Sequence, residues 1–140
     1  MSAFSDYLEE GILQHTLRGN SLPTPSTIYI ALFTSDPTDA ATGTEVTDSG
    51  YVRQDAAKGG TIESGWTSPA TSSDGKMTSN AKLIQFPPIA DGTVTVSHYA
   101  IFDAQTGGNM LYHAPFTVAK TLEINDVLSI DVGGIEIVLR

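Results

Sequence analysis

Residues 27–33 alternate between two faces, each of which is rich in apolar side chains. One face would carry Ile28, Ile30 and Leu32, and the other would carry Tyr29, Ala31 and Phe33. A period of two among β-branched and aromatic residues predicts a strand that is covered, at least in part, on both sides. A long polar loop over 34–50 follows it, and a second short strand is predicted at 51–54.

One helix is predicted near the start of the chain, over residues 5–18. Its apolar residues recur at spacings of three and four, at Phe4, Leu8, Ile12, Leu13 and Leu17. Ser5 or Asp6 would cap its first turn, and Gly19 would help to end it. Gly11 weakens the middle of such a helix by about 1 kcal/mol relative to alanine. We therefore expect packing to hold the helix in place.

The remainder of the chain alternates turn-rich segments with short apolar runs. Residues 58–80 are poor in apolar side chains and predict a second long loop, in which Trp66 is the one large anchor. Further strands are expected at 81–86, 93–103, 110–118, 121–124, 127–132 and 135–139. The two longest would form a hairpin around 105–109, and the last two would form a hairpin across Gly133-Gly134.

These elements predict a mainly β fold, either a β-sandwich or a jelly-roll-like domain with one short N-terminal helix. The chain of 140 residues is long enough for one domain with a real core, so we assign 1–140 to a single domain. Within it, 5–18 would be the helix and 27–140 the β core, interrupted by the loops 34–50 and 58–80.

Charge excludes two classes of partner. The net charge is -9, and the seven lysines and arginines are scattered along the chain. Because a protein that neutralises phosphates needs basic residues gathered on one face, we expect no binding to nucleic acid or to anionic membranes. An acidic protein of this kind is suited instead to a basic partner surface.

Cysteine is absent, which excludes disulfides, thiolate catalysis and cysteine-based metal sites. The first residues show neither the basic nor the apolar region of a secretory signal, and no apolar run approaches the ~18 residues that span a bilayer. The sequence therefore predicts a soluble cytosolic product.

Two histidines are candidates for a metal site. His98 and His113 would face each other if the hairpin around 105–109 closed symmetrically, with Asp103 nearby. Zinc needs at least one more protein ligand, and no third residue has the required spacing. A cross-strand pair of half-buried histidines is the more common outcome, so no metal is predicted here.

The loop 34–50 concentrates carboxylates, which are Asp36, Asp39, Glu45 and Asp48. The residue order of an EF-hand is absent, so we expect Asp36-Pro37 to open a turn and the other acids to be solvated. The chain also lacks a Gly-x-Ser-x-Gly elbow and any distinctive carboxylate pair. The prediction is therefore a protein without enzymatic activity and without a cofactor.

The aromatic residues leave one alternative function open. Most of them fall in predicted strands, where packing is the usual role. Trp66 lies in a loop instead, so it would either close the edge of the core or bind a neighbouring subunit. A carbohydrate-binding module that uses Trp66 and Tyr51 remains a distant alternative.

Two segments resemble a family of small structural proteins of tailed bacteriophages. The first is IALFTSDPTDAATGTEVTDSGYVRQ, which ends at Gln54, and the second is YAIFDAQTGGNMLYHAPFTVAKTL, over Tyr99–Leu122. Their order and separation fit the family, and the resemblance covers most of the chain, although residues 61–77 depart from it. Family members are described as tail-fibre-like, minor tail or head-decoration proteins. The resemblance implies a virion component without catalytic residues.

A head-decoration (cement) protein that binds the outer capsid surface and bridges its subunits is the first hypothesis. The alternative is a tail or neck attachment protein. The expected partners are the major capsid protein or tail and neck subunits, together with further copies of the chain. Contacts are assigned to the loop 34–50 and to the arm 59–76, with the helix as an alternative seam between copies. The candidate contact residues are Asp36, Pro37, Asp39, Glu45, Tyr51 and Trp66.

Overall fold

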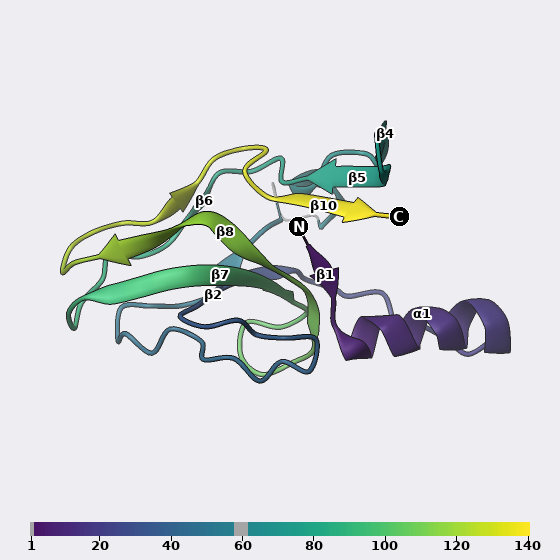
Figure 1. Cartoon of the computed structure of the whole chain (residues 1–140), viewed down its shortest axis with the longest axis horizontal. Coiled ribbons are helices and arrows are strands. Elements are labelled where there is room, and N and C mark those ends of the chain that lie inside the picture. The colour runs from purple at the N-terminus through teal and green to yellow at the C-terminus, as the bar shows by residue number, and fades with distance from the viewer. Residues whose placement is uncertain (1, 58–61) are drawn as a thin grey trace.

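A five-stranded antiparallel sheet forms one side of the molecule. The computed structural model describes residues 2–57 and 62–140. The strands of this sheet, in spatial order, are β1 (Ala3–Phe4), β8 (Met110–Leu122), β7 (Val94–Phe102), β2 (Tyr29–Phe33) and β3 (Gln54–Asp55). Strands β7 and β8 form the predicted long hairpin and curve together along the length of the molecule (Figure 1).

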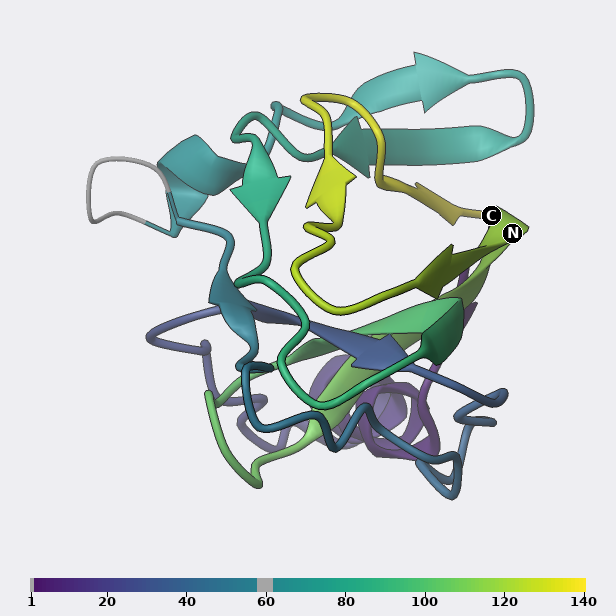
Figure 2. The same ribbon diagram turned by 90° about the vertical axis from the view of Figure 1, so that its left-hand side faces the viewer.

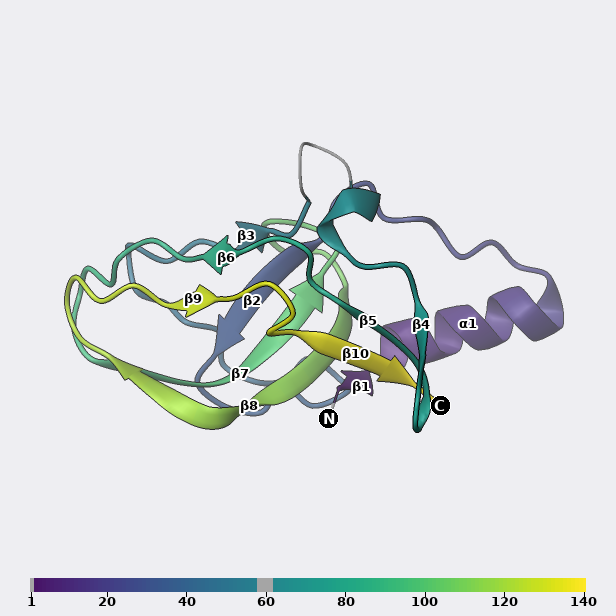
Figure 3. The same ribbon diagram turned by 90° about the horizontal axis from the view of Figure 1, so that it is seen from above.

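Two smaller sheets lie across from the large one (Figures 2 and 3). The first contains β10 (Glu136–Leu139), β5 (Gly75–Ser79) and β4 (Ala70–Ser72). The second pairs β6 (Ile84–Gln85) with β9 (Ser129–Ile130). A short 3-10 helix, η1 (Glu63–Gly65), precedes Trp66. The predicted mainly β fold with one α-helix is confirmed.

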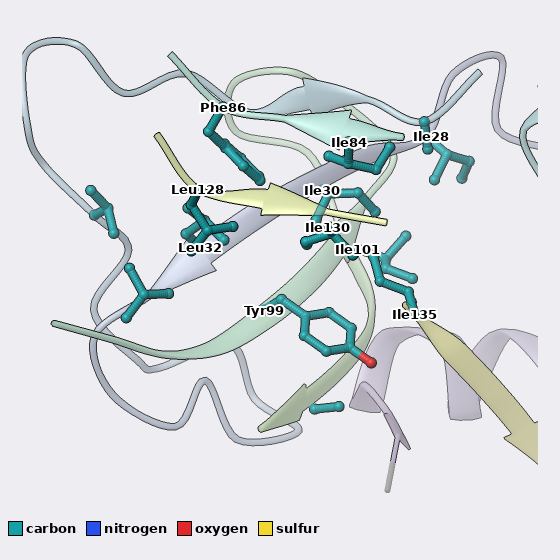
Figure 4. Packing of buried hydrophobic residues seen from close by; sticks show 14 of the residues in the cluster. Ile28, Ile30, Leu32, Ile84, Phe86, Tyr99, Ile101, Leu128, Ile130 and Ile135 are labelled. Atoms are coloured by element: carbon teal, nitrogen blue, oxygen red, sulfur yellow. The ribbon is translucent and has the colours of Figure 1, made fainter. Parts of the chain in front are cut away.

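The main core fills the space between these layers (Figure 4). Its centre consists of fully buried side chains from opposite sides, which include Ile30, Leu32, Ile84 and Ile135. The alternate residues of β2 point the other way, where Phe33 stacks on Phe102 with ring centroids 6.3 Å apart. The expectation that 27–33 is covered on both faces is thus confirmed.

The predicted helix is present as α1 (Asp6–Arg18). Ser5 caps it, because its hydroxyl accepts a hydrogen bond from the Leu8 amide at 3.2 Å. Gly19 ends it with a left-handed φ of 72°. Only Leu8 of this helix is buried, and α1 extends away from the sheets (Figure 1). Among the described residues, no helix is long and apolar enough to cross a membrane.

The prediction of one uninterrupted loop over 58–80 is wrong. Part of this range forms the hairpin of β4 and β5, which turns at Gly75 with a φ of 143°. These strands carry mostly threonine, serine and lysine, so they lack the apolar alternation that marks a strand in sequence. Backbone pairing of β5 with β10 holds the hairpin in a sheet instead.

The predicted hairpin across Gly133-Gly134 is also wrong, because β9 pairs with β6 whereas β10 pairs with β5. The chain changes sheets at a corner that Asn80 holds. The fully buried Asn80 amide donates to the Asp131 carbonyl at 2.9 Å, and its oxygen accepts from the Ile135 amide at 2.8 Å. The buried Asn80 side chain thus satisfies backbone groups on both sides of the corner and is itself fully hydrogen-bonded there.

The hairpin register corrects two further expectations. The predicted strand 110–118 and the first half of the predicted strand 121–124 belong to one continuous strand, β8, which ends at Leu122. His98 lies opposite Pro115, and His113 lies opposite Ala100, so the two histidines do not face each other. This register is set near the turn, where Phe102 pairs with Met110 and an irregularity follows between Ile101 and Phe102, so the hairpin does not close symmetrically around 105–109.

Candidate functional site

The loop 34–50 is held against the end of β2 by backbone hydrogen bonds. The Thr34 amide donates to the Thr44 carbonyl at 2.9 Å, and the Val46 amide donates to the Leu32 carbonyl at 2.9 Å. Glu45 consequently forms an isolated antiparallel bridge with Phe33. The loop therefore leaves the sheet and returns to the same strand, presenting its tip as an ordered projection.

The tip of the loop is built around Pro37, which is fully buried. Its carbonyl accepts hydrogen bonds from the amides of Thr42 and Gly43, at 2.7 and 3.2 Å. Asp36 closes the preceding turn by accepting from the Thr38 amide at 2.9 Å, as the Asp-Pro pair predicted. A side chain at Gly43 would meet the Asp36 carbonyl oxygen at 2.6 Å, so only glycine fits.

An ion pair between buried Arg53 and half-buried Glu45 anchors the end of the loop 34–50. Arg53, which is 7% exposed, donates from Nε to Glu45 Oε1 at 2.8 Å and from Nη2 to Glu45 Oε2 at 2.9 Å. The Tyr51 hydroxyl donates to the same carboxylate at 2.7 Å and accepts from the Leu32 amide at 3.1 Å. Burial acts to raise the pKa of Glu45, but the hydrogen bonds from Arg53 and Tyr51 and the charge of Arg53 outweigh it and lower that pKa.

Arg53 also ties this loop to the turn of the long hairpin. Its Nη1 donates to the carbonyl oxygens of Ala104 and Gly107, at 2.9 and 2.8 Å. Its guanidinium lies 3.7 Å above the centroid of the Phe102 ring. The Arg53 side chain thus joins the segment that ends at Gln54 to the segment 99–122.

A second clamp connects the end of the loop to residues 90–91. Asp48 accepts from the amides of Gly50, Ala90 and Asp91 at 2.8, 2.9 and 2.8 Å, and these bonds lower its pKa. In return, Asp91 accepts from the Ser49 amide at 2.7 Å. Asp48 is therefore not a free, solvated loop charge as predicted.

His113 joins the loop tip to the sheet. Its Nε2 lies 2.8 Å from Asp39 Oδ1, and its Nδ1 lies 3.7 Å from Asp36 Oδ1. The Asp39 carbonyl also accepts from the Asp6 amide at 2.9 Å, at the start of α1. His98 makes a separate contact, with the Ser97 hydroxyl at 2.8 Å. Among the residues that the structure describes, no three His, Cys, Asp or Glu side chains are grouped to hold a metal.

Trp66 lines an apolar pocket on the side of the large sheet that faces the main core. The pocket has a volume of about 270 Å³. The other residues around it come from both layers, and they are Ile28, Ile62, Glu63, Thr78, Ile101, Leu111, Tyr112 and Ile137. Trp66 packs against the main core and remains partly exposed. It therefore closes an edge of the core and also forms one wall of an open pocket.

The six candidate contact residues thus have different positions. Pro37, Glu45 and Tyr51 are engaged inside the protein, and the Tyr51 ring also stacks on Phe86 with centroids 6.1 Å apart. Asp36 and Asp39 are exposed at the loop tip, with side chains 61% and 53% exposed. The analysis of sequence missed Arg53 and Asn80. Arg53 could have been noticed because it lies in the first of the two segments that resemble the phage family, next to its last residue, Gln54.

The site is therefore an ordered loop projection and an apolar pocket on a small β scaffold, an arrangement suited to contact with other proteins. A comparison with family models matches residues 3–138 to the family described as Podophage GP4 fiber I protein gp80. The chain belongs to this family of phage fibre proteins, and it is a virion structural protein. A comparison with curated proteins gave no match.

Proposed function

We propose that the chain is a non-enzymatic component of a podophage tail fibre, which works by binding neighbouring virion proteins. The observation that carries this proposal is the family match over residues 3–138. The description of the family as a fibre protein favours the tail-fibre alternative over the head-decoration hypothesis.

The internal anchoring of the loop supports a binding role. Four separate attachments hold it before any partner is present, at Pro37, the Glu45–Arg53 pair, the Asp48–Asp91 clamp and His113. A loop that is already ordered loses little conformational entropy when it binds, which favours affinity. Binding proteins on rigid scaffolds use loops in this way.

Two surfaces are assigned to contacts with neighbours. The first is the loop tip, where Asp36 and Asp39 are exposed. The second is the apolar pocket beside Trp66, which would accept an apolar side chain of a neighbour. In this proposal Pro37, Glu45 and Tyr51 are scaffold residues that hold the first surface in shape. Tail or neck subunits and further copies of the chain are the proposed neighbours.

Locating the chain in the intact particle tests the proposal. Particles of the encoding phage are reconstructed by electron cryomicroscopy, and the copy number is measured by quantitative mass spectrometry against the major capsid protein. A tail fibre component is expected at the tail, in about a dozen to a few dozen copies, because tail symmetry limits the number of equivalent positions. Hundreds of copies on the capsid shell would support the decoration hypothesis instead. Absence from the particle would refute both.

A further inference from the structure

Helix α1 presents an apolar stripe to solvent on the side facing away from the core. Leu13 and Leu17 are 57% and 77% exposed, although they lie one turn apart on the same face. Leu8 is buried, and Gly11 and Ile12 are half-buried, so the opposite face of the helix contacts the protein. The helix therefore carries two apolar faces, of which this protein covers one.

Carboxylates continue the exposed stripe toward the start of the helix. Glu10 lies one turn before Leu13, and Asp6 lies one turn before Glu10. Glu9 flanks the same face, and all three acids are exposed. The one lysine or arginine of the helix is Arg18, which lies in the last turn and away from this stripe. The outer face thus combines two leucines with three carboxylates.

From this combination we infer that α1 docks, by its outer face, into an apolar groove with a basic rim on another virion protein. An amphipathic helix that lays leucines one turn apart into a groove is a recurrent mode of protein recognition. Lysine and arginine side chains on the rim would complement Asp6, Glu9 and Glu10. The inference rests on the proposed function, because it names the chemistry of a neighbour in the fibre.

Charge disfavours a second copy of the chain as the occupant. Each copy has a net charge of -9, so two copies repel each other. Two parallel α1 helices would also bring their acidic first turns together. A basic neighbouring protein would attract the acidic face of α1 and would bring no second set of carboxylates close to it.

Incorporation of full-length variants into phage particles tests the inference. The first variant is Leu13→Ser/Leu17→Ser, and its matched control is Leu83→Ser/Val132→Ser, which changes two apolar side chains that are 48% and 63% exposed elsewhere. The second is Glu9→Gln/Glu10→Gln. Circular dichroism and thermal melting establish that each variant is folded, and mass spectrometry measures its copies per particle.

We expect the leucine variant to lose incorporation by about tenfold or more, whereas its control incorporates like the wild type. The glutamine variant should lose incorporation severalfold, and its release from particles should depend less on salt than that of the wild type. Normal incorporation of the folded leucine variant would overturn the inference while leaving the proposed function intact.

In a second experiment, light scattering measures the oligomeric state of the purified chain. No self-association of the wild type through the outer face of α1 is expected. Self-association that Leu13→Ser/Leu17→Ser abolishes would show that a second copy covers this face, and would overturn the inference. If the wild-type chain itself is absent from particles, the proposed function fails, and this inference fails with it.

Discussion

The buried Arg53 guanidinium and the half-buried Glu45 carboxylate form a two-point ion pair, with N–O distances of 2.8 and 2.9 Å. Glu45 lies on the return of the loop 34–50, whereas Arg53 also binds two carbonyl oxygens of the turn between β7 and β8. The pair thus sets the position of the loop tip relative to the five-stranded sheet.

Arg53→Lys should lower the free energy of unfolding by about 2 kcal/mol, although it keeps the charge. Lysine cannot form the planar two-point pair with Glu45, reach both carbonyl oxygens and stack on Phe102. Urea unfolding measures the change. Arg18→Lys, on the exposed end of α1, is the matched control and should change stability by less than about 0.5 kcal/mol. Equal effects of the two substitutions would contradict the assigned role of Arg53.

Acid should weaken the same anchor. The pKa of Glu45 is lowered from its ordinary value of 4.5, so the native state favours the ionised carboxylate more than the unfolded state does. The resulting stabilisation is fully present above pH 4.5 and is lost as the pH falls through the lower native pKa. Glu45→Gln should therefore be less stable than the wild type at pH 7, and the difference should narrow below pH 4.5.

Unfolding measured from pH 7 down to pH 3 checks this narrowing. An Arg53→Met background serves as the control, because Glu45 then has no cationic partner and its substitution should cost less at neutral pH. A difference between wild type and Glu45→Gln that stays constant across the whole range would show that ionisation of Glu45 does not contribute.

Gly50→Ala should destabilise the protein by about 1–3 kcal/mol. A Cβ atom at this position would meet the Pro88 carbonyl oxygen at 2.5 Å, where the clamp of Asp48 and Asp91 brings the two segments together. Gly92→Ala is the matched control in the same region, since its Cβ would meet nothing within 4 Å. This control should be neutral or slightly stabilising, because alanine restricts the unfolded chain. Thermal unfolding of both variants distinguishes a local clash from a general effect of removing glycine.

The elements that sequence predicted correctly are those with strong local patterns. The alternation at 27–33 identified β2, and the spacing of Leu8 and Ile12 with the Ser5 cap identified α1. The hairpin of β4 and β5 was missed because its strands are polar and depend on pairing with β10. That partner lies some 60 residues away in the chain, so no local window of sequence contains the information.

The position of the loop 34–50 was predicted from sequence, but the hydrogen-bond partners of its side chains were not. The loop 34–50 was identified from its polarity, yet sequence assigned Glu45 and Tyr51 to a partner surface although both bind within the protein. The Glu45 and Tyr51 side chains point inward because they meet Arg53, and Arg53 is buried through its tertiary contact with Phe102. The anchoring of Asp48 likewise depends on residues 90–91, more than 40 positions further along the chain.

Trp66→Ala should reduce incorporation of the chain into particles, because it removes a wall of the apolar pocket. The substitution should also cost about 2 kcal/mol of stability, since Trp66 packs against the core. The point substitution tests the pocket alone, whereas deletion of 59–76 would also remove β4 and the start of β5. Copies per particle, measured by mass spectrometry, give the result.

Leu128→Ala separates the two effects of the Trp66 substitution. Leu128 is a buried core residue outside the pocket, and its truncation should cost at least as much stability as that of Trp66. If the pocket binds a neighbour, Leu128→Ala incorporates better than Trp66→Ala despite its lower stability. Equal losses would mean that Trp66 acts only through folding. Glycan binding that Trp66→Ala abolishes while incorporation stays normal would instead favour a carbohydrate-binding module, although Tyr51 is engaged by Glu45 and Phe86.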